Sequence, residues 1–97
     1  MKFSKDYSKL DKLIFTTIRK NTRHYRLPRR IWNIQTPTRK FKAYLIKLRK
    51  LKKKQITEKL ARSDGDCSKA ELIAMLEGWY GKEFDDFVLL TFQKESE

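Results

Sequence analysis

Positive charge is concentrated in the first half of this 97-residue sequence. Residues 1–55 contain 19 lysines and arginines but only two carboxylates, whereas residues 56–97 contain five basic residues and ten carboxylates. A chain of this length has room for one core, so we expect a single domain spanning residues 1–97. The segregation of charge predicts one face that attracts a polyanion and a mildly acidic opposite face. The alternative is a lysine-rich surface with no partner, as in thermophilic proteins.

Composition excludes several classes of protein. Hydrophobic residues make up 39% of the chain, too many for a disordered basic tail. No apolar run approaches the roughly 18 residues of a membrane span, and residues 1–12 lack the apolar core of a signal peptide. A single cysteine, Cys67, cannot form an internal disulfide, so we expect the reducing cytoplasm. We expect a monomer because the chain is small and strongly charged. His24, the only histidine, has no ligand partner at a suitable spacing, so we expect no metal or other cofactor.

The first 38 residues predict a short helix followed by two strands. Residues 4–14 begin with a serine suited to the N-cap and carry apolar residues at helical spacing. Residues 15–19 are β-branched and aromatic, which predicts a strand. Residues 21–28 are polar and basic and end in a proline, so they predict a loop. Residues 30–35 predict a second strand, and a turn follows around Pro37.

Residues 39–55 fit two structures. Their apolar residues match a helical stripe, but they also alternate as in a strand, with Phe41, Ala43 and Leu45 on one face. A helix here would be basic and amphipathic, suited to an anionic membrane or an acidic partner. Circular dichroism would distinguish the two structures.

The last third of the chain has clearer signals. Residues 57–62 predict a short helix that Asp64-Gly65-Asp66 ends. Ser68 and Glu71 form a capping box at the start of a second helix, which Gly78 and Gly81 end. The apolar face of this helix predicts packing for four residues: Leu72, Met75, Leu76 and Trp79. Residues 87–92 predict a buried strand.

These motifs, taken in order, resemble the ASCH domain family of the PUA-like superfamily. The resemblance rests on Thr16-Thr17-Ile18-Arg19, on Phe41-x-Ala43, on Ile56-Thr57-Glu58, and on the capped helix followed by an apolar strand. It spans nearly the whole chain. It implies an α+β fold, a small mixed β-barrel of about five or six strands flanked by two or three short helices, and it favours a strand over residues 40–48.

The resemblance also implies a possible enzyme. Some ASCH-like proteins resemble small amidohydrolases that act on acylated cytidines with a Thr, a Lys and a Glu, and others are linked to RNA cleavage. Thr17 would match the nucleophile and Asp64 lies near the Glu position, but Ile14 stands where the lysine is expected. A threonine hydroxyl is a weak nucleophile without a base. We therefore expect Thr17 and Asp64 to line a ligand cleft without catalysis, with Arg19 facing a phosphate or base carbonyl.

Basic residues around the first predicted strand are the candidate nucleic-acid site. Arginine binds phosphate well because its planar fork reaches two oxygens. The candidate phosphate ligands are Arg19, Lys20, Arg23, His24, Arg26, Arg29 and Arg30, with Arg39, Lys40 and Lys42 extending the surface. The alternative is a solvated loop with incidental charge.

Two aromatic residues beside this cluster, Tyr25 and Trp32, are candidates for stacking on unpaired bases. For Trp32 we favour a core position. The sequence as a whole favours a non-catalytic nucleic-acid-binding domain, with RNA preferred to DNA on the resemblance alone. The alternative is a small hydrolase acting on modified nucleosides or RNA.

Overall fold

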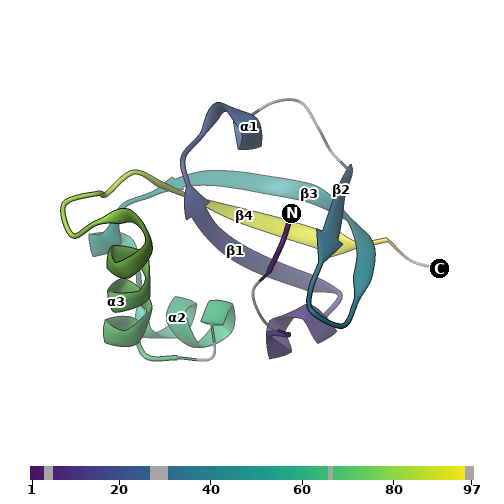
Figure 1. Ribbon diagram of the computed structural model, residues 1–97, viewed down its shortest axis with the longest axis horizontal. Coiled ribbons are helices and arrows are strands. Elements are labelled where there is room, and N and C mark those ends of the chain that lie inside the picture. Colours follow the sequence, from purple (N-terminus) through teal and green to yellow (C-terminus); the bar gives the residue numbers. More distant parts are fainter. Residues whose placement is uncertain (4–5, 27–30, 66, 96–97) are drawn as a thin grey trace.

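The computed structural model describes residues 1–3, 6–26, 31–65 and 67–95. Four strands and five short helices follow one another in this part of the chain (Figure 1). They are η1 (Ser8–Asp11), β1 (Ile14–Lys20), α1 (Arg23–Arg26), β2 (Ile31–Gln35), β3 (Lys40–Leu51), η2 (Lys53–Gln55), α2 (Glu58–Gly65), α3 (Lys69–Tyr80) and β4 (Phe87–Lys94).

The strands form one antiparallel sheet in the order β1-β4-β3-β2. β4 is central, and its run of apolar residues is explained by burial on both faces of the sheet. A register shift between Leu45 and Lys47 marks a bulge in β3 at Ile46. Lys2 forms a single parallel bridge to Gln35, so the N-terminal segment runs along the outer edge of β2.

The two faces of the sheet pack against different partners. On one face, Trp32, Leu90 and Phe92 belong to a core that includes Phe3 and Leu10 from the N-terminal segment. On the other face, a second core forms under α2 and α3, where Ile18 and Leu89 meet buried helix residues such as Leu72. Figure 1 shows α2 and α3 together at one end of the sheet.

The structure confirms an α+β fold and a strand over residues 40–48, and the helical interpretation of residues 39–55 is wrong. β3 is a strand because both of its edges are paired, with β2 over its first half and β4 over its second. The sheet has four strands in the described part of the chain, and a barrel of five or six strands is not shown.

Three local predictions need correction. Of the helix expected over residues 4–14, the described residues 6–14 form only η1, because Ile14 already pairs with Gln93 in the sheet. The expected N-cap, Ser4, lies outside the described residues. The segment expected to be a loop contains the single turn α1. α2 continues to Gly65, beyond the expected end, because Asp64 is buried and anchored rather than part of an exposed break.

The capping box of α3 is confirmed, since Ser68 accepts from the backbone N–H of Glu71 and Glu71 accepts from that of Ser68. α3 runs through Gly78 and ends at Gly81, whose φ of 99° is in the region that favours glycine. No helix among the described residues is long and apolar enough to span a membrane.

Candidate ligand cleft at the free edge of β1

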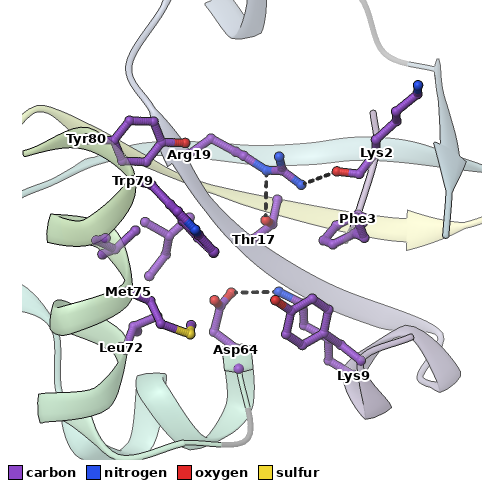
Figure 2. Close-up of a pocket in the computed structure, with 14 residues that line it drawn as sticks. Lys2, Phe3, Lys9, Thr17, Arg19, Asp64, Leu72, Met75, Trp79 and Tyr80 are labelled. Atoms are coloured by element: carbon purple, nitrogen blue, oxygen red, sulfur yellow. Dashed lines mark hydrogen bonds and ion pairs between the residues drawn. The ribbon is translucent and has the colours of Figure 1, made fainter. Parts of the chain in front are cut away.

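A cleft of about 260 Å³ lies along the free edge of β1, the edge that pairs with no strand in the described part of the chain. Its walls come from four parts of the chain: the N-terminal segment, β1, the end of α2 and one side of α3 (Figure 2). Its volume is slightly below the roughly 300–1,000 Å³ of sites for drug-sized ligands. The cleft therefore suits a small ligand or one part of a larger one.

A buried ion pair forms the floor of the cleft. Lys9 Nζ lies 3.2 Å from Asp64 Oδ1, and the two side chains are only 5% and 7% exposed. The hydroxyl of Thr16 donates to the same carboxylate oxygen at 3.0 Å. Because η1 supplies Lys9 and α2 supplies Asp64, the pair connects the N-terminal segment to the helical end of the molecule.

Burial raises the pKa of the Asp64 carboxyl above its ordinary value of 3.8. The Lys9 ammonium and the hydrogen bonds from Lys9 and Thr16 oppose this rise, and Arg19 adds a smaller opposing attraction. Desolvation is the largest effect because a carboxylate loses most of its hydration when it is buried. The cleft therefore holds a carboxyl group that is easier to protonate than an exposed one.

Arg19 forms the opposite side of the cleft. Its Nε donates to Thr17 Oγ1 at 3.3 Å, and its Nη2 donates to the backbone carbonyl of Lys2 at 3.0 Å. The guanidinium carbon also lies 4.8 Å from the centre of the Phe3 ring. These contacts fix a planar cation in place before any ligand binds, which lowers the entropic cost of using it.

Trp79 corrects the sequence prediction for α3. Its place on the apolar stripe predicts packing, yet 58% of the residue is exposed, whereas Leu72 and Leu76 on the same helix are buried. Figure 2 places the Trp79 ring on the side of α3 that faces Arg19 and Thr17. An exposed indole on the wall of a cleft is a surface on which a planar ligand can stack.

The structure brings three predicted site residues together, since Thr17, Arg19 and Asp64 all line this cleft. Lys20 lies beyond the end of the cleft, with its Nζ 5.2 Å from the Phe84 ring centre. Arg23 is exposed on α1, four residues after Arg19.

Trp32 is only 1% exposed, so the core interpretation is confirmed and the residue is not available to stack on a base. Its indole lies among Ala43 and Phe92 of the core. Tyr25 is partly buried and stacks on Trp32, with ring centres 5.7 Å apart. Both aromatic residues are therefore explained by packing.

The remaining predicted residues divide into two groups. Arg39, Lys40 and Lys42 line a separate hollow near the start of β3, in which Arg39 pairs with Asp11 at 3.0 Å. Arg29 and Arg30 lie outside the described residues, as do the side chains of His24 and Arg26. Among the described residues, the predicted nucleic-acid ligands therefore do not form one continuous patch.

Sequence reasoning missed Lys9 and Trp79. Lys9 reaches the cleft from η1, five positions before the place where the resemblance looks for a lysine, and Ile14 itself is half exposed. The sequence carried no signal for Lys9, because a residue two positions after Tyr7 lies off the helical stripe that Tyr7 and Leu10 define. The described residues contain no group of three metal-binding side chains.

Comparison of this chain with protein-family models, with curated proteins and with solved structures gives no match. The geometry of the cleft and of the surrounding charge is therefore the basis for the functional argument.

Proposed function

We propose that this chain is a non-catalytic, cytoplasmic RNA-binding domain that holds one unpaired nucleotide in the cleft at the free edge of β1. The observation that carries the proposal is that a fixed guanidinium, Arg19, and an exposed indole, Trp79, border the same small cleft. The strand order and the Lys2–Gln35 bridge support a partly closed, ASCH-type barrel as the framework.

The chemistry of the cleft fits a nucleobase and its phosphate. Trp79 offers a ring face, and stacking of a base on an aromatic side chain contributes about 1–3 kcal/mol. The guanidinium of Arg19 offers paired donors to a phosphate or to the carbonyl and nitrogen acceptors of a base. Asp64 is the matching acceptor for an exocyclic amino group.

The charge of the whole chain supplies the long-range attraction. A net charge of +12 attracts any nucleic acid, and the affinity from phosphate contacts falls steeply as salt is added. Unpaired RNA is favoured over a duplex because a cleft of this size admits a splayed base, not a stacked pair.

The first test is a salt titration of binding by fluorescence anisotropy, with single-stranded RNA, duplex RNA and single-stranded DNA of matched length. We expect all three affinities to fall with salt, and single-stranded RNA to remain the tightest ligand at about 0.2 M salt. Equal loss of all three affinities would mean that the charge attracts polyanions generally, and the proposal would fail.

Cleft variants give the second part of this test. We expect Trp79→Ala and Arg19→Gln each to weaken binding of single-stranded RNA about 5-fold or more, because each removes a direct contact. Arg62→Gln, an exposed arginine on α2, is the matched control for the charge lost in Arg19→Gln. An equal effect of the control would show that only net charge matters. Thermal melting checks that each variant is folded.

A hydrolase is the second candidate, and the position of Lys9 specifically favours it. This chain has Ile14 where the resemblance predicts a lysine. Lys9, however, lines the same cleft as Thr17 and Asp64. In such a reaction Thr17 Oγ1 would attack an acyl carbonyl and lose its hydroxyl proton, the amide C–N bond would break, and the released cytidine amine would take up that proton. Water would then hydrolyse the threonine ester.

Release of cytidine and acetate from N4-acetylcytidine, followed by chromatography, tests this candidate. We expect activity to be lost in Thr17→Val, which removes the hydroxyl, and in Lys9→Met, which removes the amine. Thr91→Val, a threonine of β4 outside the cleft, is the matched control for the first variant. If the wild-type protein releases no cytidine, the hydrolase candidate is ruled out.

A further inference from the structure

No helix or loop among the described residues covers one half of the sheet on the face that α2 and α3 cover elsewhere. Side chains alternate between faces along a strand, and residues paired across antiparallel strands share a face. Ile14 pairs with Gln93, Gln93 with Tyr44, and Tyr44 with Ile31, so these four side chains form one row across all four strands. Every member of the row is exposed, with Ile14 at 50% and Tyr44 at 38%.

The row continues the face that is buried at the other end of the sheet. Ile18 and Leu89 lie on this same face further along β1 and β4, where they pack beneath the helices. Beyond the helices the apolar character persists without cover. Ile46, pushed outward by the bulge in β3, is 52% exposed and forms a hollow with Tyr44 and Gln93. Exposed apolar side chains that gather on one face of a sheet, rather than scattering singly, are typical of an interaction site.

Basic side chains flank the row on both sides. Along β3, Lys42 lies two residues before Tyr44 on the same face, and Lys47 follows the bulge and pairs with Thr91. Lys40 and Arg49 extend the two flanks, and all four cations are exposed. None of the residues in the four strands is Asp or Glu, and the carboxylate next to this flank is Glu95, whose backbone N–H donates to the carbonyl of Lys42 just beyond β4. A second copy of this chain would bring like charges together, and it is disfavoured as the occupant.

We propose that this uncovered half of the sheet is a second contact surface for single-stranded nucleic acid. Bases lie along the row Ile14–Gln93–Tyr44–Ile31, and the phosphates on either side meet Lys42 and Lys47. The inference rests on nucleic acid being the ligand of the domain, but it concerns a surface distinct from the cleft.

The composition of the surface favours nucleic acid over an acidic protein. Gln93 is a member of the row, and Asn33, the partner of Lys42, lies on the same face next to the Ile31 end of the row. Amide groups that can both donate and accept hydrogen bonds therefore lie among the apolar side chains. Tyr44 offers a ring face, and aliphatic side chains such as Ile31 can pack against a neighbouring base. The centres of protein–protein interfaces, by contrast, are depleted of lysine.

The test compares two probes by fluorescence anisotropy: a ten-nucleotide oligouridylate, and an abasic oligomer with the same number of phosphates. We expect Tyr44→Ala to weaken binding of the oligouridylate about 5-fold or more and to leave binding of the abasic oligomer unchanged. Tyr44→Phe keeps the ring and should restore the wild-type affinity. Equal effects of Tyr44→Ala on both probes, or no effect on either, would overturn the proposal.

A charge pair gives the second arm of the test. Lys42→Gln with Lys47→Gln should weaken binding of both probes more than Lys54→Gln with Lys59→Gln, which removes the same charge from η2 and α2. Equal weakening by both pairs would overturn the proposal. So would amide shifts at Tyr44 and Gln93 that are as large with polyglutamate as with oligouridylate, since the surface would then select acidic chains.

These outcomes are separable from those for the cleft. If the Trp79 and Arg19 variants lose affinity but Tyr44→Ala does not, the cleft binds RNA and the sheet surface does not. If wild-type protein shows no preference for RNA in the salt titration, the proposed function itself fails.

Discussion

Lys9 and Asp64 are the two side chains whose burial most needs an explanation. Removing one partner of a buried ion pair leaves an uncompensated charge, which costs about 3–5 kcal/mol. Here the carboxylate is held by Lys9 and by Thr16, both at Oδ1. The pair thus connects the strand that lines the cleft to two helical segments, and the shape of the cleft depends on it.

The raised pKa of Asp64 predicts how stability changes with pH. Below about pH 3.8 this carboxyl is protonated in both the folded and the unfolded chain. As the pH rises, the unfolded chain loses the proton first, so the free energy of unfolding falls until the pH passes the higher pKa of the folded state. We expect Asp64→Asn to remove this part of the pH dependence.

Thermal melting between pH 3 and pH 7 measures this effect as the difference between wild type and variant. Asp11→Asn is the control, because it changes the same charge at a side chain that is 73% exposed. A difference in melting temperature between wild type and Asp64→Asn that stays constant from about pH 3 to pH 7 would contradict the prediction.

At the scale of elements, local signals succeeded where they specify hydrogen bonds. The capping box of α3 is formed by the two residues that the sequence indicated, Ser68 and Glu71. The signals failed where a neighbouring element decides the outcome. The sequence of β3 fits both a helical stripe and a strand, and pairing with both β2 and β4 decides for the strand. Ile14 likewise belongs to β1 and not to the predicted helix, because it pairs with Gln93 of β4.

Ser68→Ala tests the cap of α3. We expect it to lower the free energy of unfolding by about 1 kcal/mol, because the backbone N–H of Glu71 loses its acceptor. Ser68→Asp should retain most of the stability, since a carboxylate accepts the same hydrogen bond. Urea denaturation followed by circular dichroism at 222 nm gives the free energies. A loss for Ser68→Asp equal to that for Ser68→Ala would show that the cap is not the cause.

At the scale of the whole molecule, the sequence predicted the class of fold and part of the site. Thr17, Arg19 and Asp64 are close together in space as the resemblance implied. Lys9 and Trp79 could not be placed in the cleft, because their positions depend on how η1 and α3 pack against β1. The exposed row from Ile14 to Ile31 could not be predicted from the sequence either, because it depends on the register of four strands, including a bulge.

The central position of β4 has a consequence for synthesis of the protein. Both neighbours of β4 in the sheet precede it in the sequence, and it is the last element of the described chain. While a ribosome makes this chain, β1 and β3 emerge with their edges unpaired, and such edges are prone to aggregation. Eight of the strand residues are lysine or arginine and none is acidic. The same positive charge that we propose attracts a nucleic acid in the finished protein thus also keeps nascent strands of different chains apart until β4 is made.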